Sequence, residues 1–243
     1  MKKFALLAGV AIVGATSAAH ASLITTADFF TTQASPGAAT TVIDLSGITT
    51  PSQTTVVRPG YKVTFNTASN QGVVQGAASG LYAIPVAGVS SGQATYLTGN
   101  FGSAQTTNAA ASGNYLSTGG AGSSIVITFS TLQTSFALLW GSIDTGNSVA
   151  FNNAAGDVLT GTTIQALLSS SAGNGFQGPR GSAYVATTSD TPFDTVTLRS
   201  SQPSFEITAL AGSDRPFNVP EPVSLALLGA GLAGLGLIRR ARA

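Results

Sequence analysis

The alternation of apolar and polar positions along the chain predicts many short β-strands. In residues 125–129, Ile125, Ile127 and Phe129 occupy every second position. In residues 136–140, Phe136, Leu138 and Trp140 do the same. Successive side chains of a strand point to opposite faces, so a period of two indicates a strand. Other apolar segments of strand length are 41–45, 61–65, 81–86, 94–97, 149–152, 183–187, 195–199 and 205–208. Only residues 26–34 and 163–170 suggest helices, and both segments are short.

Clusters of Gly, Ser, Asn and Asp separate these segments, for example at residues 117–120, 144–147 and 152–157. These residue types favour turns because glycine accepts positive φ and the short polar side chains bond to nearby backbone. Many short strands between such turns predict an all-β fold, an antiparallel β-sandwich of jelly-roll-like form in a single domain. Residues 99–122 form the most loop-like part of this domain.

The amino end has the pattern of a secretory signal peptide. Lys2 and Lys3 precede an apolar stretch at residues 4–15, and the A-x-A site ends with Ala19 and Ala21. The apolar stretch is short for a transmembrane helix, so we expect cleavage after Ala21. The alternative is a core helix of a cytosolic protein, which the lysines at one end and the small residues at the other disfavour.

The carboxyl end has three parts. Pro220, Glu221 and Pro222 come first, an uncharged apolar run of sixteen residues follows at 223–238, and a basic cluster closes the chain with Arg239, Arg240 and Arg242. As a helix the run would be about 24 Å long, which is short but usable for a hydrocarbon core of about 30 Å. The arginines favour a cytoplasmic end, with Glu221 and everything before it outside.

These parts and their order closely resemble the PEP-CTERM sorting signal of bacterial proteins. The resemblance implies that a membrane-embedded exosortase recognises the Pro-Glu-Pro box and that the tail is a processing handle. An ordinary C-terminal anchor helix with a chance Pro-Glu-Pro sequence is the alternative. The chain then divides into a signal peptide (1–21), a β-sandwich surface domain (22–214), a linker (215–219) and the sorting signal (220–243).

Several blocks of the body are similar to one family of exosortase-dependent surface proteins. They are Phe136-Ala137-Leu138-Leu139-Trp140-Gly141-Ser142-Ile143-Asp144 with Asn147 and Phe151, the segments 193–198 and 200–202 leading into 205–207, and Asn114-Tyr115-Leu116-Ser117. The family is defined by its surface destination, so the resemblance implies no catalytic residues.

The amino-acid composition excludes several kinds of partner and reaction. Between the two processing segments, five basic residues face eight acidic ones, a formal charge of −3, so we expect no nucleic-acid partner. The chain has no cysteine, and its one histidine, His20, lies in the predicted signal peptide. The G-x-S-x-G match at residues 88–92 therefore lacks the histidine of a hydrolase triad. Carboxylates remain for glycoside hydrolysis, but no spacing selects a pair. We therefore expect that this protein is not an enzyme.

Two kinds of binding residue remain as candidates. Asp144, Asn147, Asn152 and Asp157 carry turn oxygens that calcium prefers, and plain turn capping is the alternative. No cofactor is certain from the sequence, and calcium is the one that these oxygens could hold. Tyr82, Tyr96 and Tyr115 lie beside Gly- and Ser-rich loops and could stack on sugar rings. Trp140 shares the phase of Phe136 and Leu138, which favours a core position over stacking.

Two function classes follow from these patterns. The first is an exported, non-catalytic cell-surface or extracellular-matrix protein, transiently anchored in the inner membrane by its C-terminal helix, processed by an exosortase and associated with exopolysaccharide. The second is a carbohydrate-binding module with a defined glycan site on a β-sandwich. A compact aromatic platform would favour the module, and broad weak adhesion would favour the matrix role.

Overall fold

The computed structural model of the protein describes residues 23–28, 40–48, 54–68, 71–90, 93–98, 105–107, 114–120, 122–152, 157–168, 181–202 and 204–217. The predicted signal peptide and the predicted sorting signal lie outside these residues. Within them the chain forms antiparallel β-sheet and one short helix, which confirms the all-β class.

The strands, in chain order, are β1 (Leu23–Asp28), β2 (Thr40–Val42), β3 (Thr55–Arg58), β4 (Tyr61–Asn66), β5 (Gly72–Val74), β6 (Val86–Ser90), β7 (Gln93–Thr98), β8 (Gln105–Thr107), β9 (Tyr115–Thr118), β10 (Ser124–Gly141), β11 (Asn147–Phe151), β12 (Val158–Thr160), β13 (Ala183–Ser200) and β14 (Phe205–Ser213). The helix α1 (Gly161–Leu167) follows β12, and the side chain of its N-cap residue Thr160 accepts a hydrogen bond from the amide of Thr163.

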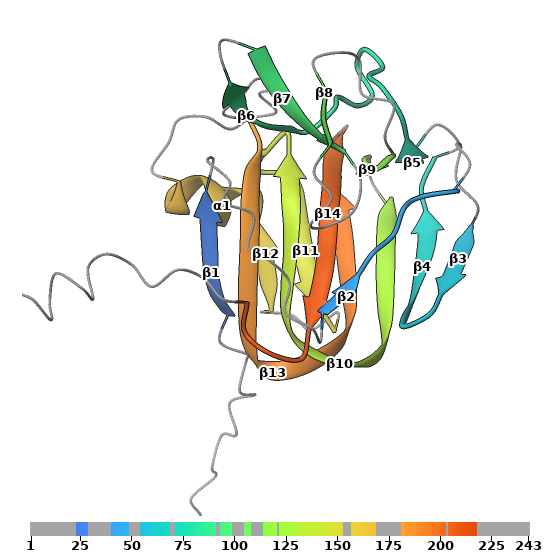
Figure 1. The fold of residues 1–243 in the computed structure, drawn as a ribbon, viewed down its shortest axis with the longest axis vertical. Coiled ribbons are helices and arrows are strands. Elements are labelled where there is room, and N and C mark those ends of the chain that lie inside the picture. The colour runs from blue at the N-terminus through green and yellow to red at the C-terminus, as the bar shows by residue number, and fades with distance from the viewer. Residues whose placement is uncertain are drawn as a thin grey trace, which may run out of the picture.

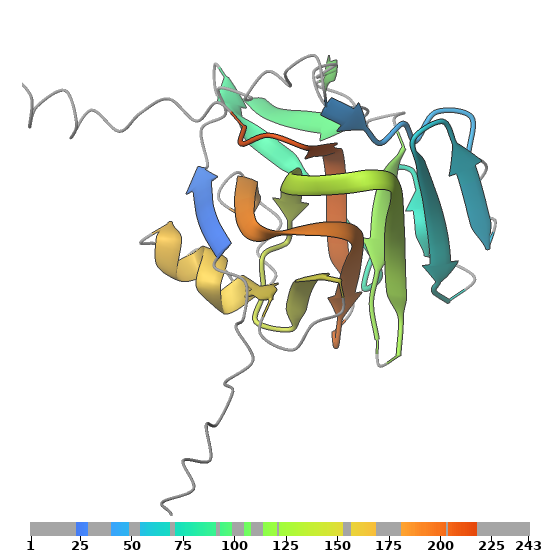
Figure 2. The ribbon, with the colours of Figure 1, turned by 90° about the horizontal axis from the view of Figure 1, so that it is seen from below.

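Two long strands, β10 and β13, organise the fold (Figure 1). The first half of β10 pairs with β4 and with the second half of β13, which in turn pairs with β11. The second half of β10 pairs with β14 and with the first half of β13, which also pairs with β1. The register shifts between Thr128 and Ser135, where both strands bend, as the view from below shows (Figure 2). One sheet therefore supplies both layers.

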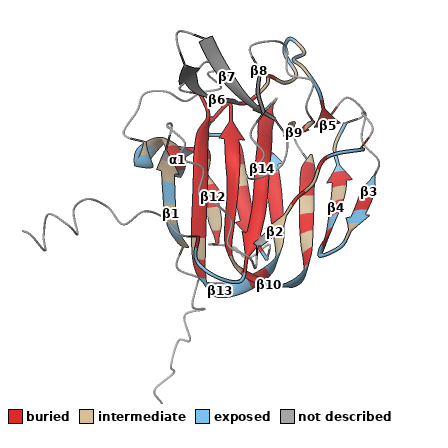
Figure 3. Ribbon diagram, viewed as in Figure 1, coloured by how far each residue is buried: buried red, intermediate tan, exposed pale blue. Residues whose placement is uncertain are grey.

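The main core lies between the two halves of these strands. Phe136 from the second half of β10 makes edge-to-face contacts with Phe129 of the first half and with Phe151 of β11, with ring centroids 6.3 Å apart in each case. Trp140 is fully buried and packs on Phe205 at 4.6 Å. Figure 3 shows the buried strand centres and the exposed bends. The predicted core position of Trp140 is confirmed.

A smaller apolar cluster covers the opposite face of the second layer. Leu139, Tyr184, Ala211 and Phe217 belong to it, and Val42 packs against it. Phe217 is only 7% exposed. The body therefore extends into the segment 215–219 that the sequence analysis assigned to a linker.

The strand predictions differ from the structure where neighbouring segments merge. Residues 125–129 and 136–140 are parts of β10, and residues 183–187 and 195–199 are parts of β13. The segment 81–86 was wrong as a strand, since apart from an isolated bridge between Tyr82 and Ala78 it is turn and irregular backbone until β6 begins at Val86. Residues 26–28 of the helix expected at 26–34 belong to β1, and the rest of that segment lies outside the described residues. The helix expected at 163–170 corresponds to α1. The loop-like region 99–122 contains β8 and the buried strand β9.

Candidate functional site

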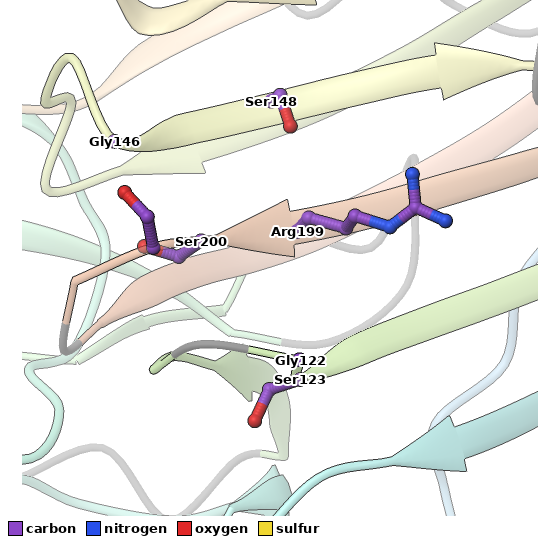
Figure 4. A pocket seen from close by; sticks show the side chains of 7 residues that line it. Gly122, Ser123, Gly146, Ser148, Arg199 and Ser200 are labelled. Carbon is purple, nitrogen blue, oxygen red and sulfur yellow. The ribbon is translucent and has the colours of Figure 1, made fainter.

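A hollow of about 280 Å³ lies at the end of the first layer, where β10 and β11 begin and β13 ends. Small residues and one cation line it, namely Gly122, Ser123, Gly146, Ser148, Arg199, Ser200 and Ser201. In Figure 4 the Arg199 side chain extends along the sheet between Ser148 and Ser123. The lining is therefore built from hydroxyl groups and a guanidinium, with no aromatic ring.

Hydrogen bonds within and between two turns, 144–147 and 200–202, fix the shape of the hollow. The Asp144 side chain accepts a bond from the Gly146 amide at 2.7 Å, and the Gly146 carbonyl accepts one from the Ser201 amide at 3.0 Å. The Ser200 hydroxyl donates to the Gln202 carbonyl and accepts from the Gln202 amide. The Ser200 hydroxyl is thus occupied within its own turn.

Two glycines, Gly146 and Gly161, allow close packing in and against the turn of residues 144–147. A Cβ atom on Gly161 would lie 1.7 Å from the carbonyl oxygen of Asp144, and one on Gly146 would lie 2.9 Å from the Ser201 hydroxyl. Only glycine fits at position 161, because the contacted atom belongs to the backbone and cannot rotate away. Contact with the first residue of α1 therefore fixes the position of the turn beside the hollow.

The outward face of the first layer continues the polar lining. Cross-strand pairing places Asn66, Ser124, Arg199, Ser148 and Thr160 in one row across five strands, which we name the polar row. Further along the same face are Lys62, Thr64, Val126, Thr128, Ala150, Thr195 and Thr197. None of these residues is acidic or aromatic. Ser124, Ala150 and Thr197 are buried, whereas Lys62 and Arg199 are exposed. The face therefore offers two cations and half-buried hydroxyl groups such as those of Ser148 and Thr160.

The predicted calcium ligands do not gather at one point. Asp144 and Asn147 lie where β11 begins, and Asn152 and Asp157 lie beyond its other end. The length of β11 separates the two pairs by about 13 Å, whereas calcium ligands lie about 2.3–2.6 Å from one ion. The described residues contain no group of three or more His, Cys, Asp or Glu that could hold a metal. The four residues therefore do not form one calcium site.

Each of these four residues has a structural role instead. Asn147 is buried and its side-chain amide donates to the Ser142 carbonyl at 3.1 Å. Asn152, with φ of 50°, donates to the Pro192 carbonyl and accepts from the Asp194 amide. The Asp157 carbonyl accepts a bond from the Phe151 amide. Burial raises the pKa of Asp144, and the hydrogen bonds from the Gly146 and Asn147 amides oppose that shift.

Tyr82 and Tyr115 do not form an exposed aromatic platform, and only the backbone of Tyr96 is described. Tyr115 is fully buried, and its hydroxyl donates to the Gly76 carbonyl, so the sugar-stacking prediction is wrong for this residue. Tyr82 is half-buried and makes an edge contact with Tyr115 at 6.2 Å. Tyr96 lies in β7, where it pairs with Val86 and Thr107.

A buried carboxyl group, Glu206, lies on the face of β14 away from the main core. Its Oε1 accepts hydrogen bonds from the Ala83 amide at 2.9 Å and from the Ser204 hydroxyl. Burial raises its pKa, and hydrogen bonds from Ser204, Ala83 and Ser142 oppose that shift. Glu206 thereby ties the segment before β6 to the sheet and has no open path to a polymer substrate, since it is fully buried.

Sequence reasoning missed the hollow. Arg199 and Ser148 come from strands that read as ordinary alternating segments, and Ser123 and Ser201 come from generic turn clusters. The available signal was the phase of Arg199 in β13, which places its side chain opposite the core residue Leu198.

The comparisons with known proteins identify one segment. Residues 218–242 match the PEP-CTERM protein-sorting motif. No curated protein and no solved structure matches the chain. The match begins directly after Phe217, the last described residue, which packs on the body.

The chain therefore carries a PEP-CTERM sorting domain. This motif marks an exported, surface-targeted protein that an exosortase processes. Among the described residues no helix is long and apolar enough to cross a membrane, and the motif lies outside those residues.

Proposed function

We propose that this protein is a non-catalytic component of the cell surface or extracellular matrix, associated with exopolysaccharide. The observation that carries the proposal is the PEP-CTERM motif, which follows a β-rich body without an intervening spacer. In this proposal the two β layers act as a jelly-roll-like sandwich for display. The tail anchors the protein transiently in the inner membrane as a short transmembrane helix until the exosortase acts.

The distribution of carboxyl groups supports a non-catalytic role. Glycosidases use two carboxyl groups about 5–10 Å apart at a cleft open to the sugar chain. Here Glu206 is buried under the segment that contains Ala83, and Asp144 is engaged by the Gly146 amide. Neither residue lines the hollow beside Arg199. We expect binding without cleavage.

Deletion of the gene in the producing cells tests this proposal. We expect reduced cell aggregation and less polysaccharide retained at the surface, both restored by the wild-type gene. Normal aggregation and normal retention in the deletion strain would contradict the matrix role. Release of reducing sugars by the purified exported protein, lost on Asp144→Asn or Glu206→Gln, would contradict the non-catalytic role.

A carbohydrate-binding module with a defined glycan site is the second candidate. The hollow beside Arg199 favours it, because a concave, hydroxyl-lined surface can orient one sugar ring. The two candidates differ in affinity. A module gives saturable binding to one class of oligosaccharide, whereas a matrix component gives weak binding that depends on many copies.

A further inference from the structure

We propose that the hollow beside Arg199, together with the polar row, binds acidic polysaccharide, with the Arg199 guanidinium holding the carboxylate of a uronic acid residue. This inference deepens the proposed association with exopolysaccharide by naming the class of polymer and the residues that hold it.

The first support is the free guanidinium of Arg199. The side chain is exposed and makes no ion pair or hydrogen bond with another residue in the described part of the chain. Its strand neighbours in the polar row are Ser124 and Ser148, which are uncharged. Arginine presents a planar fork of donors that matches a carboxylate, so an unpaired arginine over a hollow is suited to that group.

The second support is the type of hydroxyl group around it. Ser123, Ser148 and Ser201 line the hollow, and their hydroxyls make no hydrogen bond with other described residues. A serine hydroxyl both donates and accepts, as does a sugar hydroxyl, whereas the charged oxygens of a phosphate only accept. Phosphate sites instead gather backbone amides at helix N-termini or nests. The lining therefore suits a sugar acid better than a free phosphate.

The third support is the pair of exposed cations on this face. The predicted mature chain is acidic overall, yet the two charged residues among the cross-strand pairs of this face, Lys62 and Arg199, are both cations. The exposed Asp194 carboxylate accepts a hydrogen bond from the Thr195 hydroxyl, four residues along β13 from Arg199. Lys62 lies four residues along the strand direction and two strands across from Arg199, a separation of roughly 17 Å. An extended polymer with a carboxylate on successive sugars could cross the face diagonally and reach both cations.

The outward residues named for this face include no aromatic side chain, so we expect a low affinity for a single sugar. A sugar held without ring stacking depends on hydrogen bonds and charge, which water and salt weaken. Each site is then weak, and retention in a matrix depends on many copies bound to one long chain. This behaviour fits a surface component that adheres broadly.

Binding of the exported protein to polygalacturonate tests the inference, with fully methyl-esterified polygalacturonate as the neutral control. We expect binding to the acid form that declines with added salt, and little binding to the ester. Arg199→Gln should weaken binding roughly tenfold to a hundredfold, the range for a charge-assisted hydrogen bond. Arg215→Gln, an equal charge change at an exposed residue outside the hollow, should leave binding unchanged.

Equal binding by wild type and Arg199→Gln, with circular dichroism showing both folded, would overturn the site. Equal binding to the ester, or Arg199-dependent binding to anionic phospholipid vesicles without binding to polygalacturonate, would overturn the ligand class. The site and the proposed function fail separately. Cells with Arg199→Gln that retain normal matrix would contradict this site alone, whereas normal matrix in the deletion strain would contradict the proposed function alone.

Discussion

The carbonyl oxygen of Gly146 accepts a hydrogen bond of 3.0 Å from the amide of Ser201. This single bond joins the turn before β11 to the turn after β13, and the hollow lies between these turns and the start of β10. The geometry of the candidate site therefore depends on backbone contacts between turns. Substitutions that move these turns should alter binding even where they remove no lining side chain.

Gly161→Ala should destabilise the protein by about 1–3 kcal/mol, the range for overpacking. In an ordinary helix the same change stabilises, but here the new Cβ would meet the Asp144 carbonyl oxygen at 1.7 Å. Urea denaturation of the variant measures the effect. Thr162→Ala, at an exposed position in the same helix, is the control and should change stability by less than about 0.5 kcal/mol. A Gly161→Ala variant as stable as the wild type would contradict the contact.

Trp140→Ala should destabilise the protein by roughly 3–5 kcal/mol, because it removes a fully buried ring that packs on Phe205. Chemical denaturation provides the measurement. Leu132→Ala, at a residue 60% exposed, is the matched control with a small expected effect. An unchanged midpoint for Trp140→Ala would place the ring on the surface and restore its sugar-stacking alternative.

Glu206→Gln should reduce the loss of stability at rising pH. Burial raises the pKa of Glu206 above its ordinary value of 4.5, so the folded state holds this proton more tightly than the unfolded chain. The resulting stability is fully present below 4.5 and is lost as the pH rises through the raised pKa. Glutamine does not titrate. Denaturation midpoints at about pH 5 and about pH 8 should therefore differ less in the variant than in the wild type. Equal pH dependence would contradict the shift.

The sequence predicted the all-β class because alternation in 125–129 and 136–140 is visible locally, and it placed Trp140 correctly from its phase with Phe136 and Leu138. It did not predict that β10 and β13 continue through their bends. That continuity depends on pairing between distant segments, such as Leu138 with Val185, which no local pattern encodes.

The candidate site was harder to predict for the same reason. Asp144 and Asn147 lie in a turn, as the turn chemistry predicted, but nothing in the sequence places that turn beside a hollow. Their side chains bond to backbone atoms of the same region. Arg199 and Ser148 are fifty-one positions apart in the sequence and become neighbours only through the register of β11 and β13. Tyr115 read as a loop residue because β9 is short and flanked by Gly and Ser. Its burial comes from β5 and β14 on either side.

Cleavage after Ala21 should leave a mature chain that begins at Ser22. The first strand, β1, begins at Leu23 and pairs along the first half of β13, so cleavage at this point keeps the strand whole. Intact-mass and N-terminal peptide analysis of the exported protein provides the measurement. An exported chain that still begins at Met1 would contradict the signal-peptide prediction.

Processing of the PEP-CTERM tail is tested most directly by mass analysis of the C-terminal end of the surface-located protein. The measurement compares cells that express wild type with cells that express Glu221→Ala. Glu221 lies in the matched motif and outside the described body, which includes residues up to Phe217, so we expect the change to leave the fold intact. We predict that the wild type loses its tail and that Glu221→Ala retains it and stays in the membrane fraction. Asp214→Ala, which removes an exposed acid just before the motif, should be processed like the wild type. Removal of the tail from Glu221→Ala at the normal rate would contradict sorting through this motif.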